Sequence, residues 1–274
     1  MQRSEETEPG LKTVCVIPAR LASTRLNEKP LVDVAGKPLI QRVYENIAKL
    51  RAVDEVIVAA DDIRIIEVVK GFAGQAILTP KELKSGTDRV AYVCKETDAD
   101  VIVNVQCDEP LVRNEMLLTG IKPFVIDPNV VMGSLKTQIT FSQDLFDPNV
   151  VKVVTDSDDN ALYFSRLPIP YLRDRFPEYL GTDQADDERK LASLDMIKNV
   201  YYKHLGIYFY RPDFLLQFSK MPESALERAE KLEQLRALEN GFKIKVPTTE
   251  FDSIGIDTEE DLEKVRKIYQ NMER

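Results

Sequence analysis

Two neighbouring carboxylates, Asp108 and Glu109, follow a short apolar run in the sequence, with Gln106 and Cys107 in between. The run, residues 101–105, holds four β-branched apolar side chains and suits a buried strand. Pro110 ends it, because proline cannot donate a hydrogen bond to a neighbouring strand. Open α/β sheets bind ligands at the carboxyl ends of their strands, so these acids could face a divalent metal and a phosphate. An acidic turn on the surface is the alternative.

A cationic loop follows the first apolar run, residues 14–17, and carries Arg20, Arg25 and Lys29. The chain contains neither G-x-G-x-x-G nor G-x-x-x-x-G-K-[ST], so side chains would have to hold any phosphate. Arginine makes forked contacts to phosphate, and lysine supplies a point charge. The cationic loop therefore suits a phosphate group, although a solvated basic loop explains the same residues.

A further acid, Asp257, lies far along the chain, just before the capping-box pattern of residues 258–261. It and Asp108 both fall at predicted strand ends. Two converging carboxylates could hold Mg²⁺ through their oxygens. The alternative is that Asp257 is an ordinary helix cap.

The only histidine, His204, begins an apolar run after a polar, charge-rich insertion at residues 173–203. One histidine makes a zinc site unlikely on composition, and a lone histidine is usually structural. Arg166, which ends another strand-like run, is open to the same two interpretations. The residues Tyr208, Glu233 and Gln234 fit ordinary strand and helix positions.

Composition narrows the class of protein. The chain has 274 residues and a formal net charge of −9, which argues against a general nucleic-acid or anionic-membrane surface. Its three cysteines show no paired spacing, which indicates a reducing compartment. No apolar run is long enough for a signal peptide or a bilayer span. We expect a soluble cytoplasmic protein with a flexible extension at residues 1–13.

In the first half of the chain, short apolar runs typical of strands alternate with segments whose apolar residues recur at helical spacing. Such alternation predicts βαβ units and a mainly parallel α/β sheet with helices on both faces. Strands are expected at 14–17, 55–59, 75–78 and 101–105, and helices at 38–50, 63–72 and 85–93.

The second half lacks regular helices between its strand-like runs, which predicts a smaller mixed lobe. The insertion at 173–203 is expected to form a mobile loop or short helix. Strands are expected at 130–136, 151–154, 162–165, 205–210 and 242–246, with a helix at 224–238 and a final helix opening at Thr258.

Eight strings in order make the chain resemble a known family. They read IPARLASTRLNEKPL, SGTDR, VNVQCDEP, NVVKVV, ALYFSR, KHLGIYFY, KLEQLRALENG and GIDTEEDLEKV. Together they resemble the 3-deoxy-manno-octulosonate (KDO) cytidylyltransferases, from about residue 13 to the last helix. The resemblance implies a nucleotide-sugar-transferase type of Rossmann-like fold, usually dimeric. It also implies transfer of CMP from CTP to the anomeric hydroxyl of KDO with Mg²⁺, for bacterial lipopolysaccharide synthesis.

The resemblance also implies roles and parts. A single domain is expected at 14–274, with a nucleotide part at about 14–130, a sugar-acid and dimerisation part at about 131–240, and a C-terminal part at 241–274 that returns to the metal site. The implied sites are the triphosphate loop at Ala19, Arg20, Arg25 and Lys29; the cytidine surroundings at Ser85, Thr87, Arg89 and Gln106; the metal positions Asp108 and Asp257; and the sugar-acid pocket at Arg166, His204, Tyr208, Glu233 and Gln234. The expected catalytic set is Arg20, Arg25, Lys29, Asp108 and Asp257.

The chain departs from the family pattern in several places. Cys107 and Phe209 stand where relatives usually have glycine, and Asn27-Glu28 replaces Pro-Gly before Lys29. The rival interpretations are a cytidylyltransferase for 8-amino-KDO or neuraminate, and a catalytically silent binding protein on the same fold. KHLGIY and KLEQLR favour KDO. Retention of both acids and all the loop cations argues against a silent protein.

Overall fold

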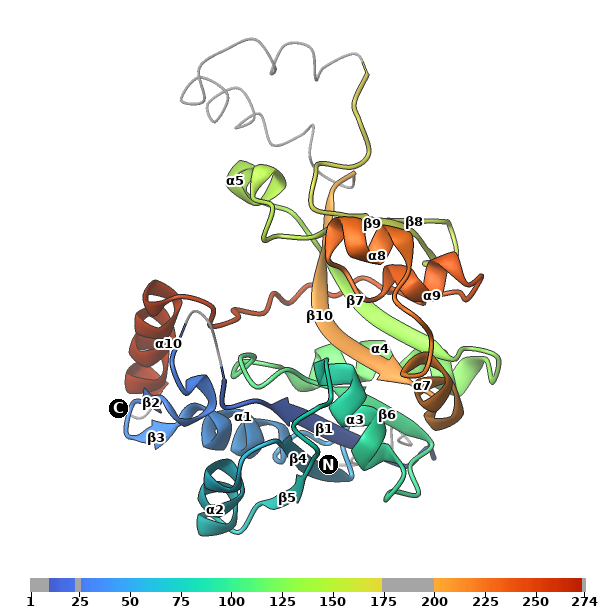
Figure 1. Cartoon of the computed structure of the whole chain (residues 1–274). Helices are drawn as coiled ribbons and strands as arrows, with labels where there is room; N and C mark the ends of the chain where they lie inside the picture. Colours follow the sequence, from blue (N-terminus) through green and yellow to red (C-terminus); the bar gives the residue numbers. More distant parts are fainter. Residues whose placement is uncertain (1–9, 23–25, 174–199, 273–274) are drawn as a thin grey trace, which may run out of the picture. The chain divides into compact units, whose positions relative to one another are not determined.

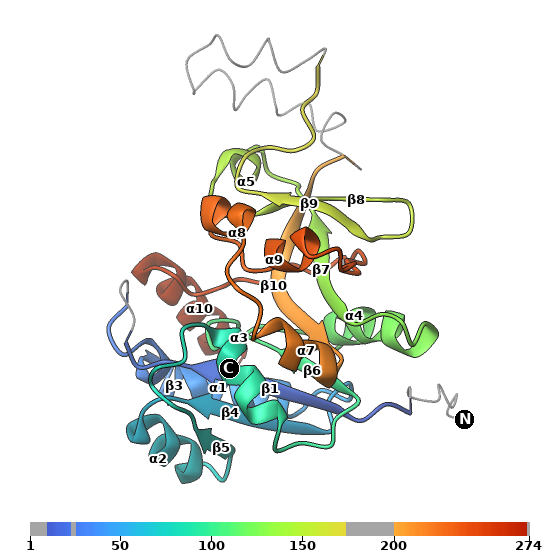
Figure 2. The ribbon, with the colours of Figure 1, turned by 45° about the vertical axis from the view of Figure 1, so that its right-hand side comes forward.

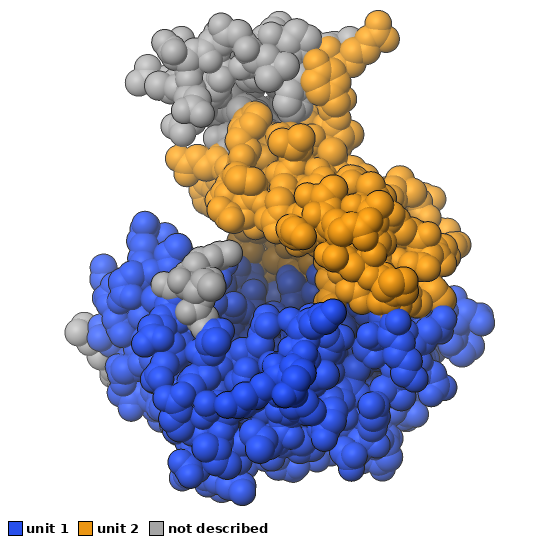
Figure 3. Space-filling view, viewed as in Figure 1, with its two compact units in different colours: residues 1–131, 206–220, 253–274 blue, residues 132–205, 221–252 orange. Residues whose placement is uncertain are grey.

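The computed structural model describes residues 10–22, 26–173 and 200–272, which divide into two compact units (Figure 3). Unit 1 takes its residues from 1–131, 206–220 and 253–274, and unit 2 from 132–205 and 221–252. Strand β10 (Tyr202–Tyr210) contributes to both units. That the chain folds as one domain stays a prediction.

Unit 1 contains the predicted parallel sheet, whose strands lie side by side in Figures 1 and 2. Its order is β5-β4-β1-β6, every adjacent pair is parallel, and the last residues of β10 pair antiparallel with β6. All residues of β1 and β6 are buried, as expected for strands covered on both faces. The bounds are β1 Thr13–Ala19, β4 Glu55–Ala60, β5 Gln75–Leu78 and β6 Val101–Asn104.

The helices of unit 1 begin where local chemistry favours them. Asp62 caps α2 (Ile63–Gly71), and Ser85 with Asp88 forms a capping box on α3 (Gly86–Cys94). The predicted box at Thr258 and Asp261 is confirmed at the start of α10 (Glu259–Met272). The other elements are η1 Lys29–Leu31, β2 Asp33–Val34, β3 Lys37–Pro38, α1 Leu39–Ile47, α4 Asn114–Ile126 and α7 Pro212–Phe218.

Helix α4 meets the unusual residue Phe209 of β10. The Phe209 ring is fully buried, and a Cβ built on Gly120 of α4 would lie 2.1 Å from two of its ring carbons. The missing side chain at Gly120 therefore makes room for the ring that replaces the glycine usual in relatives.

Unit 2 is smaller and mixed. Strand β8 (Lys152–Thr155) pairs antiparallel with β9 (Ala161–Ser165) and with the first residues of β10. The remaining elements are β7 Met132–Gln138, α5 Ser142–Phe146, α8 Ala225–Glu230 and α9 Leu235–Glu239.

Three expectations for the second half are wrong. Helix α5 lies between β7 and β8, where no helix was expected. The helix expected at 224–238 is two helices, because Lys231 takes the left-handed conformation at φ 55 and ends α8. Residues 242–246 form no continuous strand; Lys245 makes isolated bridges to Gly133 and Asn160, because Pro247 has no N–H with which to continue the ladder along β7. Most of the 173–203 insertion, and Arg25, lie outside the described residues.

Within the described ranges, every helix is too short or too polar to cross a membrane.

Candidate active site

The two predicted metal acids meet at one ammonium group in unit 1. Lys29 Nζ lies 2.6 Å from Asp108 Oδ2 and 3.2 Å from Asp257 Oδ1. The Lys29 side chain is 11 % exposed, against 28 % for Asp108 and 55 % for Asp257. The structure thus brings together three predicted residues from three separate stretches of the sequence.

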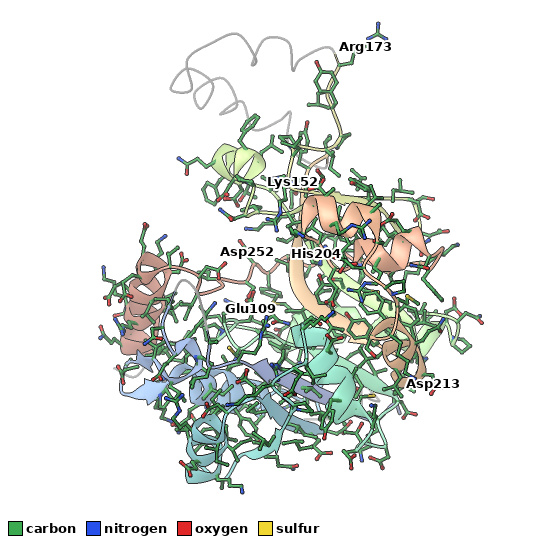
Figure 4. All side chains as sticks on the ribbon, viewed as in Figure 1. Glu109, Lys152, Arg173, His204, Asp213 and Asp252 are labelled. Carbon is green, nitrogen blue, oxygen red and sulfur yellow. The ribbon has the colours of Figure 1, made fainter. Side chains whose placement is uncertain are left out.

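Main-chain contacts hold the C-terminal stretch against the end of β6. The Ile256 N–H donates to the Asp108 carbonyl at 3.0 Å, and the Ser253 hydroxyl donates to the Glu109 carboxylate. Ile256 is fully buried, so its side chain anchors the same segment. Asp257 follows immediately, and its position is therefore set from Asp108 and Glu109 (Figure 4 labels Glu109).

The electrostatics of this cluster favour a charged lysine. Burial lowers the pKa of Lys29, but the attraction of Asp108, its hydrogen bond and the charge of Asp257 outweigh burial. The pKa of Lys29 therefore stands above its ordinary value. Carboxylate oxygens also fit a divalent cation, and Mg²⁺ commonly uses one or two of them together with substrate phosphates. Within the described ranges, groups of three or more metal-ligating side chains are absent.

The cationic loop leaves the end of β1, at the buried residue Ala19. Arg20 is exposed, and one of its guanidinium N–H groups donates to the Lys84 carbonyl at 3.0 Å. Glu28, the acid that departs from the family pattern, pairs with Arg64 at 2.7 Å. The negative charge of Glu28, next to Lys29 in the sequence, is therefore paired with Arg64.

The four residues expected around cytidine gather near α3. Ser85 caps the helix, Thr87 is buried in its first turn, and the Gln106 amide donates to Asn104 Oδ1 at 2.9 Å. A Cβ on Gly86 would lie 3.3 Å from Gln106 Oε1, so Gly86 and Gln106 are close neighbours. Arg89 is 1 % exposed and donates to Thr79 Oγ1 at 2.7 Å and to the Pro80 carbonyl at 2.9 Å.

In unit 2, His204 (labelled in Figure 4) sits in a polar contact beside an aromatic ring. His204 Nε2 lies 2.8 Å from Ser134 Oγ, and the Phe164 ring stands edge-on with its centroid 5.0 Å away. Desolvation lowers the pKa of His204 to about 3. The imidazole is therefore neutral at physiological pH.

Arg166 joins β9 to the turn after α8. Its Nε donates to the Glu230 carbonyl at 2.7 Å, and one terminal nitrogen donates to the Pro148 carbonyl at 2.7 Å. The Glu230 carboxylate accepts from the Ser165 hydroxyl at 2.8 Å and from the Arg166 N–H at 3.0 Å. Arg166 thereby fixes the start of the segment that carries the next two predicted residues.

Those residues, Glu233 and Gln234, lie between α8 and α9. Arg236 lies 3.6 Å from Glu233 and makes a buried pair with Glu227 at 2.5 Å. Tyr208, the fifth predicted sugar-pocket residue, belongs to unit 1 and stacks on Tyr210 with centroids 6.1 Å apart. The other four predicted sugar-pocket residues belong to unit 2.

Comparisons with known proteins identify the family of the chain. Residues 14–244 match the family described as Cytidylyltransferase. The 3-deoxy-manno-octulosonate cytidylyltransferase of Geotalea uraniireducens (strain Rf4) is 52 % identical over 93 % of this chain and 98 % of its own length. That of Geobacter sulfurreducens is 50 % identical over the same shares.

The chain belongs to the 3-deoxy-manno-octulosonate cytidylyltransferase family.

Solved structures support the same fold for this cytidylyltransferase. The structure of CMP:2-keto-3-deoxy-manno-octonic acid synthetase complexed with CTP is 40 % identical, with a TM-score of 0.82, over 95 % of this chain and 99 % of that one. The 4-diphosphocytidyl-2C-methyl-D-erythritol synthase of Anaerococcus prevotii, at 13 % identity and a TM-score of 0.56 over 94 % and 99 %, shares the fold. The predicted α/β fold class is confirmed.

Sequence reasoning missed Asp61, which follows β4 in this cytidylyltransferase. It accepts hydrogen bonds from the Leu21 N–H at 3.0 Å and from Arg89 at 3.2 Å. An aspartate at the carboxyl end of a predicted strand was the available signal, by the same rule that singled out Asp108.

Cys107, which directly precedes Asp108 in the sequence, is expected to react slowly with alkylating reagents. The Cys107 side chain is partly exposed, but desolvation of its thiol and the charge of Asp108 next to it raise the pKa of the thiol to about 12, so the thiol is protonated at pH 8. Because the thiolate is the nucleophile, alkylation by iodoacetamide at pH 8 should be roughly 10³-fold slower than for a free cysteine. The rate should rise as the pH increases towards 10.

Mass spectrometry of the Cys107 peptide measures this rate, with the urea-unfolded protein as the control. The other two cysteines, Cys15 and Cys94, are free and buried. Rapid labelling of Cys107 in the native protein at pH 7 would contradict the raised pKa.

Proposed function

We propose that this chain transfers CMP from CTP to the anomeric hydroxyl of KDO and releases pyrophosphate. One observation carries the proposal: Asp108 and Asp257 meet at Lys29, at the edge of the parallel sheet where ligands bind. The family membership and the 40 % identical relative complexed with CTP support the same reaction. We infer that CMP-KDO then serves lipopolysaccharide synthesis.

Cationic residues would bind the triphosphate, and polar residues would surround the cytidine. Arg20 and Lys29, with Arg25 from outside the described ranges, would bind the triphosphate and neutralise the leaving pyrophosphate. Ser85, Thr87 and Gln106 would surround the cytidine, and Arg89 would support them from its buried position. Positioning and charge neutralisation carry most of the catalysis in phosphoryl transfer, so these contacts are the main contribution of the chain.

Enzymes of this family generally use a divalent metal. We propose Mg²⁺, held by Asp108 and Asp257, because two carboxylates suit its preference for hard oxygen ligands. Such an ion, when bound, supplies charge at the α-phosphate and lowers the pKa of a hydroxyl. The raised pKa of Lys29 keeps its ammonium charged next to both carboxylates.

The sugar acid would bind through Arg166, His204, Tyr208, Glu233 and Gln234. Its carboxylate and hydroxyl groups match these donors and acceptors. We also infer a cytoplasmic homodimer. The exposed apolar side chains Phe141, Leu162 and Leu167 of unit 2, at 69 %, 62 % and 71 % exposure, are candidate contacts for this interface. Sedimentation analysis measures the oligomeric state.

Pyrophosphate release tests the proposed reaction. The purified chain is incubated with CTP and Mg²⁺ and with KDO, 8-amino-KDO or neuraminate, and a reaction without sugar serves as the control. Release should be fastest with KDO and absent without a sugar. Faster release with neuraminate or 8-amino-KDO would reassign the sugar substrate. No release with any of the three sugars would refute the proposed cytidylyltransferase activity.

His204→Ala should weaken the use of KDO and leave CTP binding nearly unchanged. A buried polar partner left unsatisfied costs enough to reduce kcat/KM for KDO about tenfold or more. Because desolvation holds the pKa of His204 near 3, the wild-type KM for KDO should show no step from this ring between pH 6 and 8. Separate titrations of CTP and KDO measure the two effects.

Ser134→Ala is the matched control for His204, because it removes the hydroxyl 2.8 Å from Nε2 and keeps the ring. It should give a smaller loss in the same direction. A lower melting temperature with unchanged KDO kinetics in His204→Ala would mean that the histidine is only structural. An equal defect for both substrates would also contradict the sugar-side assignment.

A further inference from the structure

Asp61 stands at the carboxyl end of β4 and contacts two separate parts of unit 1. Its side chain is 13 % exposed, and its own N–H donates to the Ala19 carbonyl at 3.3 Å. One carboxylate oxygen accepts from the Leu21 N–H at 3.0 Å, and the other accepts from an Arg89 terminal nitrogen at 3.2 Å. The residue therefore joins the start of the cationic loop to α3.

Arg89 extends this connection into the segment before α3. The guanidinium is almost fully buried and donates to Thr79 Oγ1 and to the Pro80 carbonyl. Burial lowers the pKa of Arg89, and the Asp61 carboxylate opposes that effect. A buried guanidinium needs such a counter-charge, because desolvating an unpaired charge is costly.

A carboxylate suits this position better than an amide would. Both of its oxygens accept hydrogen bonds, so Asp61 can bind the Leu21 N–H and the Arg89 guanidinium at once. An amide has one accepting oxygen, and its NH₂ group would face one of these two donors. The second link between the same segments, from Arg20 to the Lys84 carbonyl, is exposed and therefore weaker.

We propose that Asp61 is a positioning residue for the nucleotide, which sets the cationic loop against the segment that leads into α3. The inference rests on the proposed function, since these are the two parts expected to hold the triphosphate and the cytidine. Asp61 does not touch the nucleotide in this proposal. It acts through Leu21 and Arg89.

Asp54 offers a matched control at the opposite end of the same strand. It directly precedes β4, and its carboxylate accepts from the Thr13 N–H at 2.7 Å, at the start of β1. Asp54→Asn and Asp61→Asn each remove one negative charge from a carboxylate that accepts from a main-chain N–H, of Thr13 at the start of β1 and of Leu21 just after its end. Only Asp61 lies at the carboxyl end of the sheet.

Calorimetric titration with CTP and Mg²⁺ tests the proposal on wild type and both variants. Asp61→Asn should weaken CTP binding about tenfold, as expected for charge-assisted hydrogen bonds, and leave the KM for KDO within about twofold. Asp54→Asn should bind CTP like wild type. Wild-type CTP affinity in Asp61→Asn, or a defect limited to melting temperature, would overturn the inference.

If Asp61→Asn fails to fold, Thr79→Val tests the same link through Arg89 without changing a charge. It removes the Thr79 hydroxyl that accepts from Arg89 and keeps the side-chain volume. CTP binding should weaken by a smaller factor, with KDO kinetics unchanged; unaltered CTP binding would overturn the inference.

If wild type itself does not bind CTP, the proposed function fails and the inference with it. If wild type binds and Asp61→Asn binds equally, only the inference fails.

Discussion

Asp108→Asn is expected to lower kcat by roughly 10²–10³-fold while the protein stays folded, as for other losses of a preorganised charge at a reacting centre. Asparagine keeps the shape of the side chain and removes one of the two negative charges around Lys29. With one carboxylate left, the cluster would hold a divalent cation more weakly and the triphosphate less accurately. Asp257→Asn should act in the same direction, with some loss of order at the start of α10.

Three measurements separate these effects: steady-state kcat, thermal unfolding, and binding of Mn²⁺ as a paramagnetic probe without substrates. Asp98→Asn is the control, because its carboxylate is 79 % exposed and pairs with Lys12. It should match wild type in all three. Near-normal turnover in either Asp108→Asn or Asp257→Asn would refute the two-acid site.

Gly120→Ala should destabilise unit 1 by about 3 kcal/mol, at the upper end of the range for overpacked cores. The added Cβ would lie 2.1 Å from two carbons of the buried Phe209 ring, so either the ring or α4 must move. A free-energy change of this size should lower the melting temperature by roughly 10 °C in a chain of this length. Thermal or urea unfolding measures it.

Gly71→Ala provides the matched control, since Gly71 also lies in a helix and its added Cβ would meet nothing within 4 Å. It should be neutral or slightly stabilising. In a Phe209→Leu background, Gly120→Ala should cost less than in wild type, because the smaller side chain relieves the contact. Equal costs in both backgrounds would show that the ring is not the cause.

The parallel sheet and part of the acid cluster were predictable from sequence because they follow local rules. Continuous apolar runs such as 101–105 indicate strands buried on both faces, and the carboxyl ends of parallel strands meet at one edge. That rule places Asp108 and the loop that carries Lys29 at the same edge, whereas Asp257, which follows no strand, enters the predicted site through the family resemblance. Capping patterns likewise located the starts of α3 and α10.

The missed features depend on partners that are remote in the sequence. Nothing around Asp61 reveals that Leu21 and Arg89 will converge on its carboxylate. The sequence around Phe209 does not show that its large side chain fits, because the space for the ring comes from Gly120 on another element. The break at Lys231 was missed for another reason: a left-handed residue other than glycine or asparagine leaves no mark in a helical apolar pattern.

The acid cluster forms in two stages while the chain is synthesised, because its members are far apart in the sequence. Lys29 and Asp108 are 79 residues apart, whereas Lys29 and Asp257 are 228 apart. On the ribosome, β1, the cationic loop and β6 are therefore synthesised well before the segment that carries Asp257. A nascent chain can pair Lys29 with Asp108 alone, and the second carboxylate arrives only when Ile256 docks on the Asp108 carbonyl. The proposed two-acid site is thus complete only after the segment that carries Asp257 has been translated.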